Sequence, residues 1–446
     1  MAFCTVVMLE YEADPAERFS HFCTAPGAIL LDSGRPVADR GRYDIASAWP
    51  LKTFVPSENQ SADSFFTELR GSLAALGKSE VPAGLELPFC GGLIGYLGYD
   101  FGRRLEQLPA CSNNDLDLPD AQLGLYDWAL VTDHVEHRTV VVFHPSAPAS
   151  RRDAVLTALE REHGPAKAFE LRGVFCADTD AASYRSGIER IHGYIAAGDC
   201  YQVNYAQRFS GRYEGAPWQA YRRLRAVCPT PFSAYVSLDS NQAILSHSPE
   251  RFLSLNGRHV ETRPIKGTRP RGKTPSDDRL NSDDLLTSPK DRAENLMIVD
   301  LLRNDLGRSC TAGSVNVPQL FALETYPNVH HLVSSVEGEL AADRDVFDLL
   351  AGSFPGGSIT GAPKIRAMEI IDELEPTRRG PYCGSILYID VNGRMDSSIT
   401  IRTLLAWSGR IHCWGGGGIV ADSNWQAEYE ESITKVRVLL DTLQAP

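Results

Sequence analysis

The sequence has few of the features that mark membrane proteins and nucleic-acid-binding proteins. No apolar stretch in its 446 residues approaches the length of a membrane span. Its 44 lysine and arginine residues are outnumbered by 57 acidic residues, which gives a net charge of −13. Because a phosphate backbone is bound by a basic surface, we expect neither nucleic acid nor a membrane as a partner. An acidic chain that takes an anionic ligand must gather its cations locally, so arginine-rich segments are candidate sites.

The ten cysteines show neither CxxC pairs nor the spacing of metal ligands. Scattered cysteines are typical of reduced thiols that fill a core, which predicts a cytoplasmic protein. Residues 1–15 contain no basic region, and Glu10 interrupts their short apolar run. This start favours an opening strand over a signal peptide.

Helical and strand-like segments are mixed along the chain without an internal repeat. Apolar residues at three- and four-residue steps predict a helix over 180–197, and a serine followed by a proline predicts the start of another over 288–308. A last helix is expected over 425–442. Several strand-like segments lie between them, and Asn256-Gly257 is a strong hairpin signal. This mixture predicts an α+β fold with antiparallel strands rather than a parallel nucleotide-binding sheet.

Two regions can be separated along the chain. Residues 1–150 are rich in strand-like segments, and the polar stretch 144–180 is the expected join. The second region, residues 175–446, carries most of the unusual polar motifs. We expect the two regions to be intertwined in one compact unit.

The segment PIKGTRPRG (264–272) contains a lysine with two arginines close behind it, Arg269 and Arg271. Lys266 would be a nucleophile only when neutral, and burial or neighbouring cations lower a lysine pKa towards that state. Glu250, sixteen residues earlier, could supply a proton to a departing group. On spacing alone, the pattern also fits a surface lysine beside a turn.

Three glutamates lie on two of the predicted helices. Glu294 belongs to the helix over 288–308, whereas Glu428 and Glu431 are three residues apart and share one face of the last helix. Carboxylates that converge from different helices are the oxygen ligands that Mg²⁺ prefers. Exposed helices are also rich in glutamate, so the structural interpretation stays open beside the predicted Mg²⁺ site.

Two glycine-rich segments are expected to be turns, FPGGSITGAPK (354–364) and CWGGGGIVADS (413–423). The first precedes a helix whose free amide groups could bind an anion. Four consecutive glycines in the second indicate that its backbone passes very close to another group. Neither segment has P-loop or GxGxxG spacing, so nucleotide binding is not favoured.

Arg402 is expected in an alternating strand, SITIRTL (398–404), with one face buried. A buried arginine needs an anionic partner. Tyr382 and the pair His330-His331 are polar groups in otherwise apolar segments. Each of them, taken alone, is more often structural than functional.

Together, eight motifs resemble in order and spacing those of the chorismate-utilising enzymes, which include anthranilate, isochorismate, salicylate and aminodeoxychorismate synthases. They are SPERFL, PIKGTRPRG, DRAENLMIVDLLRNDLGR, HHLVS, FPGGSITGAPKIRAMEII, SITIRT, GGGGIVADS and EYEES, and they span about 180–440. In the first half ILLDSG (29–34), GRYDI (41–45) and GGLIGYLGYD (91–100) resemble the amino-terminal part of the anthranilate and aminodeoxychorismate branches. The resemblance implies two large, mainly antiparallel β-sheets packed together and flanked by helices.

Two positions discriminate between branches of this family. Gln202 stands where isochorismate and salicylate synthases carry a lysine that activates water, so water is not the expected nucleophile. Lys266 stands where anthranilate synthases carry alanine, and this lysine is typical of the aminodeoxychorismate branch. The resemblance therefore implies amination of chorismate to 4-amino-4-deoxychorismate, for 4-aminobenzoate and folate biosynthesis. Anthranilate synthesis is the alternative.

The resemblance also implies a role for each site residue. Glu250 would protonate the C4 hydroxyl of chorismate, and Lys266 would attack C2 as that hydroxyl leaves; ammonia would then add at C4 and expel the lysine. Glu294, Glu428 and Glu431 would hold Mg²⁺. The residues implied to bind substrate or line its pocket are Gln202, Gly267, Thr268, His331, Ser358, Tyr382, Arg402, Gly416, Gly417, Gly418 and Lys435.

The resemblance also implies a partner subunit and a bound amino acid. A glutamine amidotransferase carries its cysteine in a Gly-x-Cys-x-Gly turn, and no cysteine of this chain is flanked in that way. Ammonia is therefore expected from a separate glutaminase subunit. In relatives, the amino-terminal segments line a tryptophan pocket, whose expected lining here is Ser33, Tyr43 and Asp44.

Overall fold

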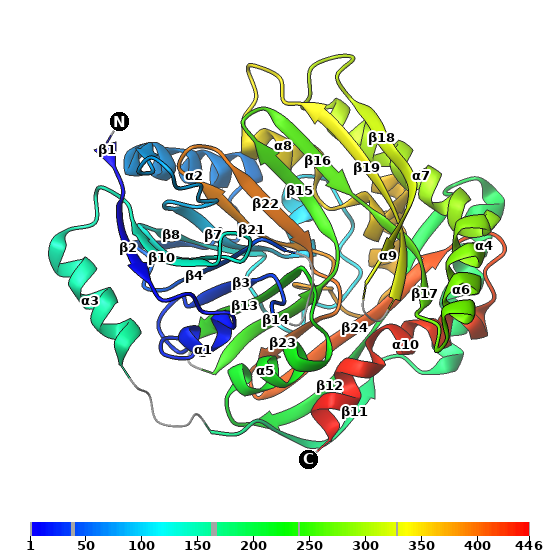
Figure 1. The fold of residues 1–446 in the computed structure, drawn as a ribbon. Coiled ribbons are helices and arrows are strands. Elements are labelled where there is room, and N and C mark those ends of the chain that lie inside the picture. The colour runs from blue at the N-terminus through cyan, green and yellow to red at the C-terminus, as the bar shows by residue number, and fades with distance from the viewer. Residues whose placement is uncertain (1, 37–40, 162–166, 240, 327–328, 446) are drawn as a thin grey trace.

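The computed structural model describes residues 2–36, 41–161, 167–239, 241–326 and 329–445. Within this part of the chain, nearly all strands join two large antiparallel sheets, and helices surround them (Figure 1). The expected α+β fold, with two mainly antiparallel sheets packed together and flanked by helices, is confirmed.

The first sheet has twelve strands in the order β11-β12-β24-β23-β14-β13-β3-β4-β9-β10-β2, with β20 paired to β12. Its strands are β2 (Thr5–Leu9), β3 (Ile29–Asp32), β4 (Tyr43–Ser47), β9 (Trp128–Asp133), β10 (Arg138–Phe143), β11 (Glu170–Ala177), β12 (Gln202–Glu214), β13 (Phe232–Asp239), β14 (Gln242–Ser248), β20 (Gly361–Ala362), β23 (Thr403–Trp407) and β24 (Arg410–Ile419).

The second sheet has ten strands in the order β17-β19-β16-β15-β22-β21-β7-β8-β5, with β18 paired to β19. Its strands are β5 (Lys52–Phe54), β7 (Gly92–Leu97), β8 (Ala121–Tyr126), β15 (Arg251–Asn256), β16 (His259–Arg263), β17 (Ile265–Pro270), β18 (Asn316–Thr325), β19 (Val329–Glu339), β21 (Ser385–Asp390) and β22 (Met395–Ile399). A small parallel pair is formed by β1 (Ala2–Phe3) and β6 (Ser79–Glu80).

The helices are α1 (Pro15–Phe19), α2 (Ala62–Leu76), α3 (Ala149–Glu160), α4 (Ala181–Ala197), α5 (Pro217–Val227), α6 (Pro275–Thr287), α7 (Pro289–Gly307), α8 (Val346–Ser353), α9 (Lys364–Leu374) and α10 (Trp425–Gln444), with 3₁₀ turns at Tyr99–Arg104 and Gly357–Ile359. Among the described residues, no helix is both long enough and apolar enough to cross a membrane.

Both sheets contain strands from the two ends of the sequence. In the first sheet β13 pairs with β3, and in the second β21 pairs with β7. Neither 1–150 nor 175–446 therefore completes a large sheet by itself. Each must fold together with the other.

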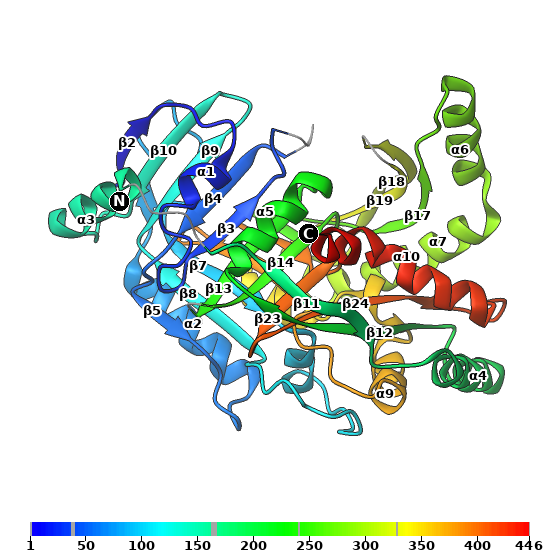
Figure 2. The same cartoon turned by 90° about the horizontal axis from the view of Figure 1, so that it is seen from below.

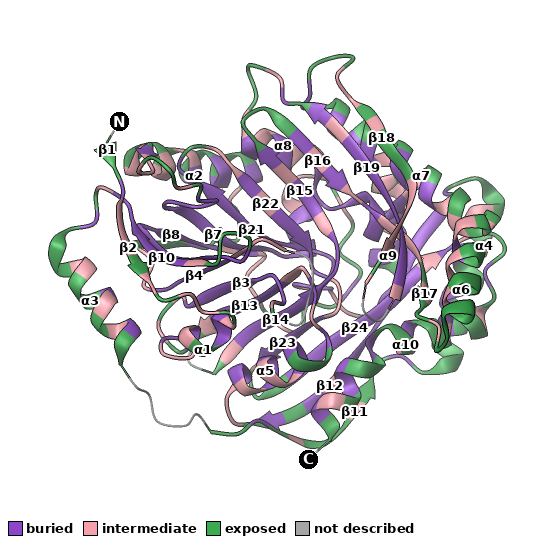
Figure 3. Cartoon of the chain, in the orientation of Figure 1, coloured by how far each residue is buried: buried purple, intermediate pink, exposed green. Residues whose placement is uncertain are grey.

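Two hydrophobic clusters hold these layers together. The first includes side chains from both sheets and from α2, α7, α8 and α9. The second lies on the outer face of the first sheet, under α1, α3, α5 and α10, and contains the fully buried Trp128 and Trp218. Figure 2 shows α5 and α10 in front of these strands, and Figure 3 shows buried strands with exposed outer helix faces.

The expected helix starts are confirmed by their caps. The Asp180 side chain accepts from the backbone N–H of Ser183 at the start of α4, and Ser288 accepts from Asp291 N–H at the start of α7. The expected hairpin joins β15 and β16, but its two turn residues are Gly257-Arg258, because Asn256 still pairs with His259. α7 and α10 thus carry the three glutamates on well-defined helices.

Two expectations about local structure are wrong. The glycine run of 413–423 forms no turn, because Gly415 to Gly418 lie within β24 and pair with β12. Arg402 does not lie in a strand but between β22 and β23, with a left-handed φ of 50°. The chain passes there from the second sheet to the first, which interrupts the alternation.

Candidate active site

The candidate site forms where the chain passes between the two sheets. Glu250 lies between β14 of the first sheet and β15 of the second, and Arg402 lies between β22 and β23. Backbone hydrogen bonds join the two crossings, from Ile399 N to Glu250 O at 3.0 Å and from His247 N to Arg402 O at 3.1 Å. One corner of the fold therefore brings together a carboxyl-bearing and a guanidinium-bearing segment.

Ser358 connects the two expected catalytic side chains. The Nζ of Lys266, on β17, donates to the backbone carbonyl of Ser358 at 2.9 Å. The Ser358 hydroxyl donates to Oε1 of the buried Glu250 at 2.7 Å. A lysine amine and a carboxyl group are thus held on either side of one residue, as the sequence predicts for a nucleophile and an acid.

Burial shifts both groups away from their charged forms. It lowers the pKa of Lys266, against the opposing effect of the carboxylates of Glu250 and Glu294. Burial also raises the pKa of Glu250, although Lys266 and the Ser358 hydroxyl act in the opposite direction. A neutral amine can attack and a protonated carboxyl can donate, so both shifts favour the reactive protonation state.

The residues after Lys266 are held by β19, α6 and α7. Gly267 has a φ of +76°, and a Cβ added to it would lie 2.7 Å from Leu285 Cδ1 and 2.9 Å from Asp291 Oδ1. Thr268 lies opposite His331, with 2.8 Å between Oγ1 and Nδ1. Burial lowers the pKa of His331 to about 4, so its ring is neutral near pH 7.

The three glutamates of α7 and α10 interact with one another and with lysines. Burial and the charge of Glu431 raise the pKa of Glu428, whose Oε1 lies 3.9 Å from Lys290 Nζ. Burial also raises the pKa of Glu294. For Glu431 the effect of burial is outweighed by Lys435, which lies 2.8 Å away and lowers the pKa of this carboxyl.

The chemistry of these donors fits Mg²⁺. They are oxygen ligands only, and the mutual repulsion of the carboxylates is a cost that a divalent cation would remove. In the described parts of the chain, no cluster of three or more histidine, cysteine or carboxylate side chains is arranged closely enough to hold a metal ion by itself. An ion that keeps several waters and takes oxygens from a substrate does not need such a cage.

The first two glycines of β24 are required by close neighbours. A Cβ on Gly415 would overlap the backbone carbonyl of Ser432 in α10. A Cβ on Gly416 would lie 2.5 Å from the carbonyl oxygen of Tyr205 in β12. Because these neighbours are backbone atoms, they cannot move aside easily, and glycine is needed for α10 and β12 to pack this closely on β24.

The next two glycines face polar side chains instead. A Cβ on Gly417 would lie 3.3 Å from Glu428 Oε2 and 3.4 Å from Lys435 Nζ. A Cβ on Gly418 would overlap the amide of Gln202, which is fully buried and, in the described structure, without a hydrogen-bond partner for either side-chain atom. Gly417 therefore faces the charged side chains of α10, whereas the amide of Gln202 fills the space beside Gly418.

Arg402 and Tyr382 lie near this strand. Arg402 is half-buried, and within the described residues its side chain contacts the Cys228 thiol but forms no ion pair with a carboxylate. A guanidinium without a carboxylate partner suits a substrate carboxylate. Tyr382 is buried and stacks on Trp414 of β24, with ring centroids 6.0 Å apart and planes 5° apart.

A separate cavity of about 510 Å³ opens between the two sheets. Ser33 and Tyr43 line it, as expected for the amino-terminal pocket. Asp44 is not among the lining residues: its buried carboxylate accepts from the Ser33 N–H and contacts His134 behind the wall. Other lining residues are Leu31, Asp32, Phe232, Arg251, Tyr388, Met395 and Asp396.

This cavity and the catalytic groups use opposite sides of the same segments. Pro249 and Ile265 line the cavity, whereas their neighbours Glu250 and Lys266 do not. Successive residues of extended chain point to opposite sides. The expected catalytic pair, Glu250 and Lys266, and the cavity are therefore separate, although the residue before each of the pair lines the cavity.

Sequence reasoning missed Lys290, which faces Glu428, and the buried ion pair of Arg379 with Glu375. A signal for Lys290 was present, because a lysine in the first turn of α7 opposes the helix dipole and suggests a nearby anion. Glu375 lies only four residues before Arg379, but the carbonyls that Arg379 also contacts, those of Ile359 and Asn204, lie far away in the sequence, so no local pattern singles out this arginine.

Residues 28–441 match the family of chorismate binding enzymes. The chain belongs to this family. It is 47% identical to aminodeoxychorismate synthase component 1 of Klebsiella aerogenes, over 99% of both chains, and 39% identical to anthranilate synthase component 1 of Thermus thermophilus, over 94% of this chain and 93% of that one. Its structure resembles anthranilate synthase component I of Streptococcus pneumoniae with a TM-score of 0.77 and 30% identity, covering 90% of this chain and 92% of that one.

Proposed function

We propose that this chorismate-utilising enzyme aminates chorismate at C4 to give 4-amino-4-deoxychorismate. The observation that carries the proposal is the contact of Ser358 with both Lys266 and Glu250. Anthranilate synthesis needs no nucleophile on the protein, and a buried lysine beside a buried acid would have no part in it. Relatives named aminodeoxychorismate synthase component 1 cover nearly the whole chain at 47% identity, which supports the same choice.

The first step forms a bond between Lys266 Nζ and C2 of chorismate. Glu250 gives its proton to the C4 hydroxyl, which leaves as water while both ring double bonds shift, from C1=C2 and C5=C6 to C1=C6 and C4=C5. The new C2 ammonium then returns a proton to Glu250. In the second step ammonia adds at C4, both double bonds shift back and the C2–Nζ bond breaks, with Glu250 returning the proton to the leaving amine. Two easier displacements replace one difficult one.

Substrate carboxylates would be held by Arg402 and by the cations and backbone amides near β24. Lys435 Nζ donates to the carbonyl of Gly416 at 3.0 Å, which places its ammonium beside the glycine strand. The buried Tyr382 and the Thr268–His331 pair would shape the pocket around the ring. Glycine at 417 leaves the space that a bound anion needs next to Lys435.

Glu294, Glu428 and Glu431 would hold Mg²⁺, which would bind a ring carboxylate and neutralise its charge. Lys290 and Lys435 balance part of the negative charge of these glutamates. Excess chelator should therefore abolish turnover, and zinc should not be needed.

The name component 1 of the relatives implies a second component. We infer that it is a glutamine amidotransferase that supplies ammonia, and that the cavity lined by Ser33 and Tyr43 binds tryptophan. Cytoplasmic localisation is part of this proposal, and the ten free cysteines, eight of them buried, agree with a reducing compartment.

The deciding experiment incubates the purified chain with chorismate, Mg²⁺ and an ammonium salt. A product that a lyase converts to 4-aminobenzoate supports the proposal, whereas fluorescent anthranilate supports the alternative. Glutamine should replace ammonium only after a glutaminase subunit is added. Strong glutamine-dependent turnover by the isolated chain would contradict the assignment of the nitrogen donor.

A further inference from the structure

The ion pair between Arg379 and Glu375 is among the most buried charged groups of the described structure. Arg379 is 1% exposed and Glu375 is 6% exposed. The guanidinium donates to the carboxylate twice, from Nε to Oε2 at 2.9 Å and from Nη2 to Oε1 at 2.7 Å. A buried ion pair contributes little net stability compared with apolar side chains, so its presence calls for another explanation.

The other hydrogen bonds of the pair reach two segments of the active site. Arg379 Nη1 donates to the carbonyl of Ile359 at 3.1 Å, in the turn that contains Ser358. Nη2 donates to the carbonyl of Asn204 in β12 at 2.8 Å. The backbone N–H of Asn204 also donates to the carbonyl of Thr360 at 2.8 Å. Two neighbouring carbonyls after Ser358, those of Ile359 and Thr360, are therefore linked to β12, one through Arg379 and one directly.

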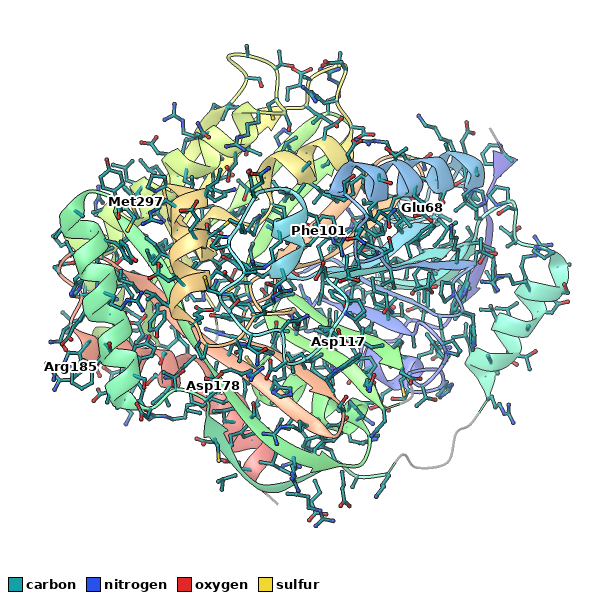
Figure 4. The ribbon with its side chains drawn as sticks, turned by 180° about the vertical axis from the view of Figure 1, so that it is seen from behind. Glu68, Phe101, Asp117, Asp178, Arg185 and Met297 are labelled. Atoms are coloured by element: carbon teal, nitrogen blue, oxygen red, sulfur yellow. The ribbon has the colours of Figure 1, made fainter. Side chains whose placement is uncertain are left out.

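Glu375 extends the connection to the glycine strand. Its Oε1 accepts from the backbone N–H of Ala206 at 2.9 Å, and Ala206 lies opposite Gly416. The guanidinium carbon of Arg379 also lies 5.8 Å from the ring centroid of Tyr382. Glu375 and Arg379 follow directly after α9 in the chain. Figure 4, seen from behind, shows α9 beside α4.

We infer that Arg379 and Glu375 are positioning residues, whose ion pair sets the Ser358 turn in register with the β12–β24 strands that face the substrate. The inference deepens the proposed function and rests on it. Arginine is required, because only its planar fork can donate to Glu375, Ile359 and Asn204 at the same time. Lysine would keep the charge but lose this geometry.

The test compares Arg379→Lys with the parent chain in ammonium-dependent turnover and in single-turnover formation of the Lys266 adduct. Misplacing a reacting group by about 1 Å can cost about 100-fold in rate, and we expect a fall in kcat of that order. The matched control is Arg103→Lys, because Arg103 also pairs with buried carboxylates, those of Asp100 and Asp372, but contacts no residue of the site. Its kcat should stay within about threefold of the parent value.

A double-mutant cycle with Ser358→Ala separates positioning from general stability. If Arg379 acts through the Ser358 turn, Arg379→Lys should cost much less in the Ser358→Ala background than in the parent chain. The inference would be overturned if the kcat loss of the double variant equalled the product of the two single losses. It would also be overturned by a folded Arg379→Lys chain with normal kcat. If Arg379→Lys does not fold, Glu375→Gln takes its place, and failure of both to fold would assign the pair to the fold alone. A parent chain without ammonium-dependent turnover would refute the proposed function itself.

Discussion

The hydroxyl of Ser358 sets the acid strength of Glu250, and Ser358→Ala should therefore move the pH profile of the reaction. This hydroxyl donates to Glu250 Oε1 at 2.7 Å and stabilises the ionised carboxylate. The contact of Lys266 with Ser358 uses the backbone carbonyl, which the substitution leaves in place. The change thus removes one donor to the acid and keeps the contact to the nucleophile.

The magnitude follows from the energy of a hydrogen bond to a charged group, about 1.5–3 kcal/mol. Loss of a donor of this strength destabilises the ionised carboxylate, so it should raise the pKa of Glu250. The acid works when protonated, and activity falls as pH rises through this pKa. Raising the pKa therefore moves the alkaline limb to higher pH.

The measurement is kcat against pH with saturating chorismate, Mg²⁺ and ammonia, the last kept constant as the free base. Lys266 must be neutral while Glu250 is protonated, so the limb reports an apparent pKa of the coupled pair. The plateau should fall about tenfold, because the carboxyl group loses its orienting contact. Ser353→Ala is the control, since Ser353 is equally buried and its hydroxyl has no partner in the described structure. An alkaline limb that stays in place, or moves to lower pH, would refute the reasoning.

Three further results are expected. Glu294→Gln and Glu431→Gln should each lose most turnover and leave the circular dichroism spectrum unchanged. Calorimetry in the presence of chorismate should show weaker Mg²⁺ binding, and tight binding by both variants would rule out these two glutamates as ligands. Lys266→Ala should abolish the mass increase on the lysine peptide that chorismate leaves without ammonia, and should shift the product towards anthranilate; unchanged C4 amination would make the lysine a bystander. Gly416→Ala should lower the melting temperature clearly, since its Cβ meets a backbone carbonyl, whereas Gly417→Ala should unfold like the parent but raise KM; equal melting temperatures for both would contradict the packing argument.

The parts of the fold that could be predicted from sequence are those whose determinants are close together in the chain. The caps Asp180 and Ser288 contact backbone amides three residues away, and the two-residue turn Gly257-Arg258, directly after Asn256, closes its own hairpin. The helix α6 was missed, although Thr274 caps it in the same way, because its apolar face is weak and only Leu285 is buried.

The candidate site was predicted through its motifs more than through its geometry. Lys266 and Glu250 were singled out by residue type and by family resemblance, but their common partner Ser358 lies 92 residues from one and 108 from the other. The glycines of β24 were correctly interpreted as places of close approach. The prediction of a turn was wrong, because these glycines lie in a strand that α10 and β12 approach from its two sides.

The amino-acid sequence by itself determined the family and the helices that carry the glutamates, and it predicted the acid and the nucleophile. Only the tertiary structure decided that Arg402 leaves its strand, that Asp44 stands behind the cavity wall, and that Arg379 ties the Ser358 turn to β12. The physical reason is the range of the interactions. Caps and turns act within a few residues, whereas the two sheet crossings and the hydrogen bonds from Arg379 to Ile359 and Asn204 form only when segments far apart in the sequence have come together.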